Sequence, residues 1–141
     1  MGVITVNTEA EFAVAIAGPT LVVVDFFATW CGPCRAIAPY LENLSKQPDV
    51  VEAGVRFLKV DVDRLDALAA QCSVSAMPTF HFYMGGKKVA EVVGARQNMI
   101  KKHLDAHLAA SKKAAAATGA GAAAAPASAA PAAAPAGAGA K

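Results

Sequence analysis

The chain has 141 residues, a length that suits one domain and makes two improbable. Its hydrophobic content of 55% is inflated by the segment from Ala114 to Lys141, in which 18 of 28 residues are alanine. All 11 acidic residues but only 10 of the 13 basic ones precede Ser111, and this near-neutral part argues against nucleic acid or an anionic membrane as a partner. Three cysteines are too few for a secreted scaffold held together by disulfides.

The N-terminal region carries no targeting signal that we recognise. No Lys or Arg precedes Arg35, and no apolar stretch leads to a small-residue cleavage site. The longest early apolar run, Leu21 to Ala28, contains Asp25 and is far short of the roughly 20 residues that span a membrane. We therefore expect a monomeric cytoplasmic protein that has no membrane segment.

The first elements read as strand, helix, strand. A short β-prone run over residues 3–6 is followed by Thr8 and Glu11, a capping box that predicts a helix through Ala17. Leu21–Phe27 is continuously apolar and β-branched apart from one acidic residue, as in a strand covered on both faces of a largely parallel sheet. We expect it to be the central strand.

The next elements continue the alternation. Apolar residues recur at helical spacing after Cys34, with Pro39 predicting a kink and Pro48 the end of that helix. Residues 55–62 resemble a second buried strand, and residues 64–71 a short helix.

The second half of the domain follows another pattern. Residues 79–84 and 88–93 are two extended runs joined by a Gly-Gly-Lys turn, which predicts an antiparallel hairpin. Residues 95–110 form an amphipathic pattern typical of a final helix. Together these elements predict an α/β fold over residues 1–110, with a central mixed sheet flanked by helices.

Residues 111–141 predict a disordered tail, because Ala, Gly, Pro, Ser and Lys dominate there and no large apolar side chain is present. Residues 114–117 could continue the last helix by one turn. Two roles for the tail stay open, a flexible solubilising spacer and a weakly basic docking segment.

The most informative segment is Trp30-Cys31-Gly32-Pro33-Cys34, where the central strand ends and a helix begins. A helix N-terminus offers free N–H groups and a positive dipole end, so the thiol of Cys31 should have a pKa below the usual value of about 8.5 and act as a nucleophile. Cys34 lies one turn later, should be more buried, and is the predicted resolving thiol. Gly32 permits the tight turn into the helix, and Pro33 presets a helical φ.

Two other kinds of chemistry are compatible with this cysteine pair. A Cys-x-x-Cys pair also binds zinc or an iron–sulfur cluster, but the remaining candidate ligands are Cys72 and the pair His103 and His107, which do not make a recognisable set. A pair of inert buried thiols is the other alternative. Cys72 itself is expected to be a small buried hydrophobe, or else a site of oxidation, and His81 a satisfied histidine without a functional role.

Several motifs, taken in order, resemble the thioredoxin family: Val24-Asp25-Phe26, Ala28 to Cys34, Pro39, Phe57 to Asp61, Met77 to Phe80, and Gly94. The resemblance extends from Val3 to about Leu108. It implies the thioredoxin fold and a protein-disulfide reductase that donates electrons to target proteins in cell redox homeostasis. It further implies no bound cofactor and recharging by NADPH through a flavoprotein thioredoxin reductase, or by a ferredoxin-linked reductase in plastids.

Asp25 is a candidate for proton transfer. It interrupts an apolar strand a few residues before the thiols, and burial there would raise its pKa and make it a base for Cys34. The resemblance implies the same role, with Lys59 on the adjacent strand as its charge partner. The alternative is that each side chain reaches water from a strand end.

The resemblance also implies a substrate-binding surface. Met77-Pro78 corresponds to the cis-proline loop of the family, whose backbone faces the cysteines and offers an edge to an extended substrate, although a trans bond is commoner at a strand start. Trp30 is expected to flank the site, and the alternative is a tryptophan buried in the core. Gly94 is expected to let a partner protein approach the site closely, and the alternative is that it only forms a turn before the last helix. The predicted substrate-binding residues are Trp30, Gly32, Pro33, Met77, Pro78 and Gly94.

The predicted reaction is reduction of protein disulfides by thiol–disulfide exchange. The Cys31 thiolate attacks, a mixed disulfide forms, and Cys34 expels the reduced substrate. Pro33 between the cysteines resembles the reducing members of the family, and Arg35 keeps a positive charge beside the thiols. The main alternative from another class is a binding module that borrows this fold to stabilise a partner complex.

Overall fold

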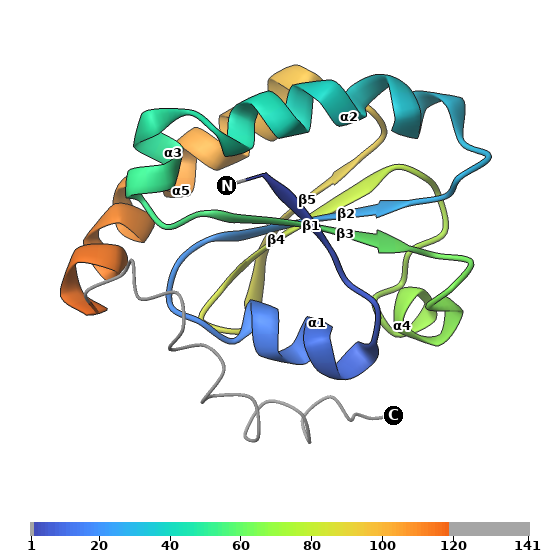
Figure 1. Ribbon diagram of the computed structural model, residues 1–141, viewed down its shortest axis with the longest axis horizontal. Coiled ribbons are helices and arrows are strands. Elements are labelled where there is room, and N and C mark those ends of the chain that lie inside the picture. Colours follow the sequence, from blue (N-terminus) through green and yellow to red (C-terminus); the bar gives the residue numbers. More distant parts are fainter. Residues whose placement is uncertain (1, 119–141) are drawn as a thin grey trace.

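The computed structural model describes residues 2–118, which form one five-stranded mixed sheet with helices on both faces (Figure 1). The strand order is β1-β3-β2-β4-β5; the pairs β1–β3 and β3–β2 are parallel, and the pairs β2–β4 and β4–β5 are antiparallel. In chain order the elements are β1 (Val3–Thr5), α1 (Glu9–Ile16), β2 (Val22–Phe27), α2 (Gly32–Ser45), α3 (Pro48–Glu52), β3 (Arg56–Asp61), α4 (Asp66–Gln71), β4 (Thr79–Met84), β5 (Lys87–Val93) and α5 (Gln97–Thr118). The predicted α/β class and the central position of β2 are confirmed.

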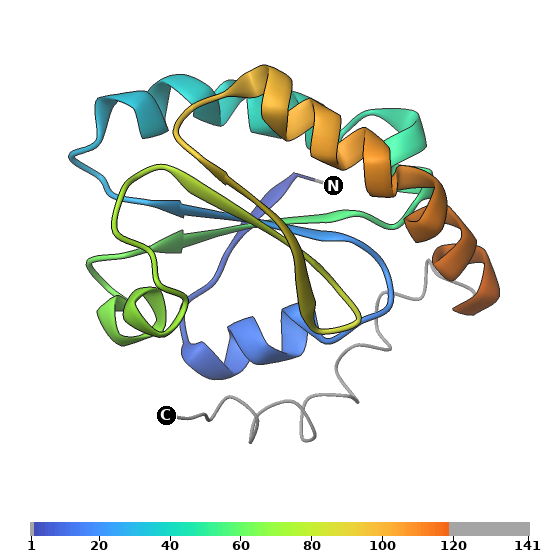
Figure 2. The same cartoon turned by 180° about the vertical axis from the view of Figure 1, so that it is seen from behind.

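The two faces of the sheet bury separate apolar clusters. Side chains alternate along a strand, so Val23 of β2 joins one cluster while Val22, Val24 and Phe26 join the other. Helices α2, α3 and α5 cover the first face, and α1 and α4 cover the second (Figures 1 and 2). Because β2 is covered on both sides, its sequence is apolar throughout except at Asp25, rather than alternating.

Local sequence signals account for the first helix and the hairpin. The hydroxyl of Thr8 accepts the N–H of Glu11 at 3.1 Å, and the carboxylate of Glu11 accepts the N–H of Asn7 at 2.8 Å, as expected of a capping box. Gly85 and Gly86 link β4 to β5 with φ angles of 62° and 83°, the left-handed region that a two-residue hairpin turn requires.

Helix α3 departs from the sequence-based expectation. Pro48 does not simply close the preceding helix, which ends at Ser45, but stands in the first turn of a new one. Proline is well suited to that position because its φ is preset and its missing N–H has no intrahelical partner there. The apolar residue Val50 of this helix is buried, so tertiary packing stabilises a helix that is too short to be stable alone.

The last helix corrects the predicted domain boundary. Instead of ending near residue 110, α5 runs to Thr118, with Ser111 fully buried and Ala115 only 2% exposed. Assigning 111–118 to a disordered tail is therefore wrong, while the expected continuation of the helix over 114–117 is confirmed. Alanine favours helix, and the buried serine adds long-range contacts that composition does not reveal. The rest of the predicted tail, 119–141, lies outside the described residues.

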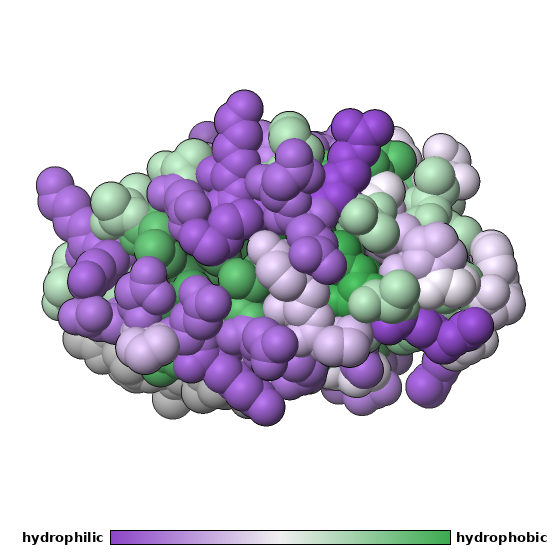
Figure 3. All heavy atoms as spheres, turned by 90° about the horizontal axis from the view of Figure 1, so that it is seen from above, coloured by the Kyte–Doolittle hydropathy of each residue, from purple (hydrophilic) through white to green (hydrophobic). Residues whose placement is uncertain are grey.

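The outer surface of the α2, α3 and α5 layer is largely hydrophilic, with smaller apolar areas between the charged side chains (Figure 3). Within residues 2–118, no helix is both long and apolar enough to cross a membrane.

Candidate redox-active site

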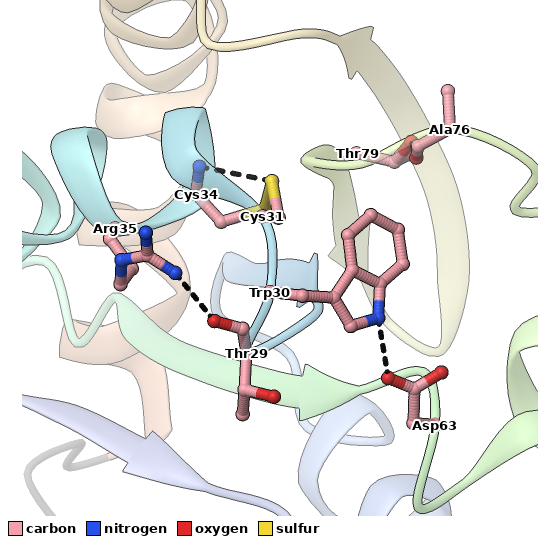
Figure 4. The surroundings of a disulfide bond; sticks show 8 residues. All are labelled: Thr29, Trp30, Cys31, Cys34, Arg35, Asp63, Ala76 and Thr79. Atoms are coloured by element: carbon pink, nitrogen blue, oxygen red, sulfur yellow. Dashed lines mark hydrogen bonds between the residues drawn. A yellow bond between two sulfur atoms is a disulfide. The ribbon is translucent and has the colours of Figure 1, made fainter.

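The two cysteines lie at the junction of β2 and α2. Cys31 is the N-cap of α2, and its Sγ accepts the backbone N–H of Cys34 at 3.1 Å (Figure 4). A disulfide joins the two residues, whose Cα atoms are 5.3 Å apart. After reduction, the same N–H and the positive end of the helix dipole would stabilise a thiolate at Cys31. The predicted place of Cys31 at the start of this helix is thus confirmed, and its role as the nucleophile stays a prediction.

Both cysteines are almost fully buried. The sequence predicts that Cys34 is the more buried of the two, and the exposed fractions, 4% for Cys34 and 5% for Cys31, are nearly equal. In the oxidised pair both residues pack with Ala28 in a small cluster at the end of β2, so the bond holds the first sulfur against the protein as closely as the second. What distinguishes the two sulfurs is the helix-capping position of Cys31.

Asp25 is buried within β2, so its side chain does not reach water from the end of the strand. It is 6% exposed, and its Oδ1 is fully buried without a hydrogen-bond partner among the described residues. Burial raises the pKa of this carboxyl from 3.8 to about 7, and the positive charge of Lys59 opposes the rise. A group with this pKa exchanges a proton readily near neutral pH.

Lys59 lies directly across from Asp25 in the pairing of β2 with β3. Its ammonium group is 5.8 Å from the centre of the Phe27 ring, and the residue is half-buried. The lysine therefore influences the carboxyl through the field of its charge, while its stem covers the strand.

Trp30 is an exposed flank of the site, as predicted. Its side chain is 65% exposed, and its Nε1–H donates to Oδ2 of Asp63 at 2.9 Å (Figure 4). On the other side of the cysteines, Nη1 of Arg35 donates to the carbonyl oxygen of Thr29 at 2.6 Å. The indole is thus fixed in orientation although most of its surface faces solvent.

Asp63 is a site residue that sequence reasoning missed. It follows β3, the parallel neighbour of β2, so both strands end at the same edge of the sheet. An acidic residue just beyond that strand was the available signal. Its backbone N–H also donates to Oδ1 of Asp61 at 2.9 Å, which holds the loop in shape.

The remaining predicted substrate-binding residues form two groups, one of Met77, Pro78 and Gly94 and one of Gly32 and Pro33. The Met77–Pro78 peptide bond is cis, as the resemblance implied, and Met77 packs against the cysteine cluster. The N–H of Gly94 donates to the carbonyl oxygen of Pro78 at 2.8 Å. Gly94 has a φ of 99°, which favours glycine, while a Cβ there would meet only ordinary contacts with Arg96. Gly32 and Pro33 are exposed in the first turn of α2.

Cys72 and His81 belong to the second apolar cluster and its margin, away from the cluster that holds the disulfide. Cys72 is half-buried, and burial raises the pKa of its thiol. His81 is fully buried, with Nε2 3.1 Å from a carboxylate oxygen of Glu91 and Nδ1 3.3 Å from the Tyr83 hydroxyl. It is a satisfied core histidine, as predicted. In the described part of the chain, no group of three or more His, Cys, Asp or Glu could hold a metal ion.

We expect the Asp63 contact to orient Trp30 for substrate binding. Removing the acceptor with Asp63→Ala should lower kcat/KM for insulin-disulfide reduction about fivefold, the effect of one hydrogen bond worth roughly 1 kcal/mol. Asp63→Asn keeps an acceptor oxygen and should recover most of the loss. The protein has a single tryptophan, so its fluorescence reports directly on the indole. Unchanged fluorescence and kinetics in Asp63→Ala would contradict the role.

A cysteine pair at the start of a helix, linked by a disulfide and preceded by a buried carboxyl in the strand that leads into the helix, defines a site for dithiol–disulfide exchange. The family profile described as thioredoxin matches residues 3–106. The chain is 45% identical over 107 residues to thioredoxin of Ictalurus punctatus, covering 74% of this chain and 98% of that protein. It is 48% identical over 101 residues to thioredoxin-1 of Saccharomyces cerevisiae, covering 72% of this chain and 94% of that one.

Solved structures agree with these matches. Thioredoxin of Malassezia sympodialis superposes with a TM-score of 0.71 at 37% identity, covering 77% of this chain and 95% of that one. Thioredoxin of Fasciola hepatica superposes with a TM-score of 0.68 at 42% identity, with coverages of 74% and 98%. The chain belongs to the thioredoxin family. It is a thiol-disulfide oxidoreductase, a protein-disulfide reductase whose redox-active pair is Cys31 and Cys34.

Proposed function

We propose that this reductase takes electrons from NADPH through a thioredoxin reductase and delivers them to disulfide-bonded proteins in the cytoplasm, working as a monomer. In a plastid, a ferredoxin-linked reductase would replace the first partner. The observation that supports electron transfer by this pair is the capping geometry of Cys31, whose sulfur accepts the N–H of Cys34 at the start of α2. This geometry favours the thiolate, which is the species that attacks a disulfide. The electron source, the compartment and the monomeric state are proposed from the family resemblance.

The reaction would proceed in two exchange steps. The Cys31 thiolate attacks one sulfur of the substrate disulfide, forms a mixed disulfide and releases the other substrate sulfur as a thiolate. The Cys34 thiol then loses its proton to the carboxylate of Asp25, attacks the sulfur of Cys31 and releases the second substrate sulfur. The substrate gains two electrons, and the chain is left with the Cys31–Cys34 disulfide.

Asp25 suits the second step because its pKa of about 7 lies near physiological pH. A base with an ordinary carboxyl pKa would hold the proton too weakly to accept it from a thiol at useful rates. The charge of Lys59 across the strand pair would keep part of the carboxyl population ionised. Burial and charge support both roles, which Asp25→Asn and Lys59→Met test.

The substrate would lie across the exposed surface between Trp30 and the Met77–Pro78 loop. Trp30 offers an apolar face of fixed orientation, and Met77 adds a second apolar contact beside the cysteines. Gly94 is joined to this loop by the hydrogen bond from its N–H to the carbonyl oxygen of Pro78, and it would belong to the same surface. Backbone groups of the loop would pair with an extended substrate chain.

A coupled assay tests the proposal. With NADPH, a thioredoxin reductase and insulin, the chain should support steady NADPH consumption and precipitation of reduced insulin chains. A parallel reaction with a ferredoxin-linked reductase distinguishes the two electron sources. Omitting the chain, or supplying Cys31→Ser, should reduce the rate to background. Background rates with both reductases, while dithiothreitol-reduced protein still reduces insulin, would contradict the proposed electron source and leave the reductase activity standing.

A further inference from the structure

The C-terminal part of α5 is not explained by the reductase function. The thioredoxin profile ends at residue 106, yet α5 continues without interruption through Thr118. Two residues of this extension, Ser111 and Ala115, are buried although they lie beyond the matched region. They stand four positions apart and therefore share one face of the helix.

Ser111 makes two long-range hydrogen bonds from a fully buried position. Its hydroxyl oxygen accepts the backbone N–H of Leu21 at 2.9 Å and donates to the carbonyl oxygen of Ala53 at 2.7 Å. Leu21 directly precedes β2, and Ala53 caps the C-terminus of α3. The serine thus joins three segments that are far apart in sequence and satisfies a donor and an acceptor of the buried backbone.

Ala115 continues the contact one turn further on. A Cβ placed on Gly54 would lie 3.5 Å from the Cβ of Ala115 and 3.1 Å from Cγ2 of Thr20. The helix therefore passes close to the backbone at Gly54, where φ is 69°. Larger side chains at either position would push the helix away. The pair Lys112–Glu52, 3.2 Å apart but half exposed to solvent, adds little.

We propose that residues 109–118 are a latch, an integral part of this fold that closes the end of the molecule where β2 and β3 begin. The chain reverses direction at this end between α3 and β3, and the latch covers that corner (Figures 1 and 2). Cys31 lies beyond the opposite end of β2, roughly 20 Å away for a six-residue strand. The latch should therefore stabilise the domain without altering disulfide exchange.

The full-length chain carrying Ser111→Val tests the latch. Valine offers no hydrogen bond, so the Leu21 N–H and the Ala53 carbonyl lose their partner while buried, and its extra methyl group adds overpacking that Ser111→Ala, tested in parallel, does not. We expect the unfolding equilibrium constant in urea to rise roughly 10- to 100-fold. Ala110→Val is the matched control, because it puts valine one position earlier on the exposed side of the same helix.

Hydrogen exchange locates the effect. The Leu21 amide should be protected nearly as well as the core amides in the parent protein, and should exchange much faster in Ser111→Val. Ala115→Leu should also speed exchange of the Leu21 amide, because residue 115 is buried, while Ala116→Leu at an exposed position should leave the exchange rate unchanged. If Ser111→Val fails to fold, Ser111→Ala supplies the measurement of stability. Equal unfolding equilibrium constants for Ser111→Val and Ala110→Val, or rapid exchange of the Leu21 amide in the parent protein, would overturn the proposal that these residues form a latch.

The reductase assay separates this inference from the proposed function. We expect kcat/KM for insulin reduction to change less than twofold in folded latch variants, because the site lies at the other end of β2. A large loss of activity with unchanged stability would contradict a purely stabilising latch.

Discussion

Cys31→Ser is expected to abolish disulfide reduction, and Cys34→Ser is expected to stop the reaction halfway. Serine at position 31 leaves no thiolate to attack the substrate, so turnover should fall at least about a thousandfold, as when other enzymes lose their nucleophile. Serine at position 34 leaves the first attack intact but removes the thiol that resolves the mixed disulfide. The Cys34→Ser protein should therefore accumulate a covalent adduct with its substrate.

Nonreducing electrophoresis and intact mass spectrometry measure the adduct directly. With an oxidised protein substrate in excess, Cys34→Ser should gain the mass of one substrate chain, and dithiothreitol should reverse the gain. Cys72→Ser serves as the control, because Cys72 lies apart from the redox cluster and its thiol could otherwise form unrelated adducts. Introduced alongside Cys34→Ser, it should leave the adduct yield unchanged. An adduct retained by Cys31→Ser but absent from Cys34→Ser would reverse the two assigned roles.

Much of this fold and site could be predicted because the decisive signals are local. The buried run of β2 marks the centre of the sheet, and the motif from Trp30 to Cys34 places a nucleophile at a strand-to-helix junction. The cis geometry of Met77–Pro78 came from family resemblance alone, since sequence does not encode it as a local pattern.

The features that were missed depend on contacts between distant segments. Asp63 is an ordinary loop residue until β3 lies beside β2 and brings it within hydrogen-bonding distance of Trp30. Ser111 belongs by composition to a low-complexity segment, and only its bonds to Leu21 and Ala53, 90 and 58 positions away, make it part of the core. Composition measures average tendencies and does not show which single small residue packs against a backbone.

Burial also determines the pKa of Asp25, because a charged carboxylate is costly inside the folded protein. Its pKa is about 7 in the fold against an ordinary 3.8, so between these values the folded state binds a proton that the unfolded state has released. The contribution of Asp25 to the free energy of unfolding is fully present below pH 3.8, and it is lost as the pH rises through the folded-state pKa of about 7. Over about three pH units, at roughly 1.4 kcal/mol each, the loss approaches about 4 kcal/mol.

Asp25→Asn removes this titration and leaves a neutral side chain of similar shape. We expect the oxidised variant to match the parent in free energy of unfolding near pH 4 and to exceed it by as much as about 4 kcal/mol at pH 8, measured by urea titration at both pH values. Lys59→Met should shift the parent's loss of stability to higher pH, because the charge of Lys59 opposes the rise in the pKa of Asp25. A stability difference that is the same at pH 4 and pH 8 would contradict a buried, titrating carboxyl.

The stabilised Asp25→Asn protein should nevertheless be a slower reductase. Without the carboxylate, the Cys34 thiol must lose its proton to water, and resolution of the mixed disulfide should slow on the order of 100-fold, the lower range for a missing general base. The first attack by Cys31 does not use this base, so mixed disulfide should build up transiently in rapid-quench experiments. This pairing of higher stability with slower resolution distinguishes proton transfer from a structural role, because a residue that only supported the fold would lose activity and stability together. Resolution at the parent's rate would exclude Asp25 as the base.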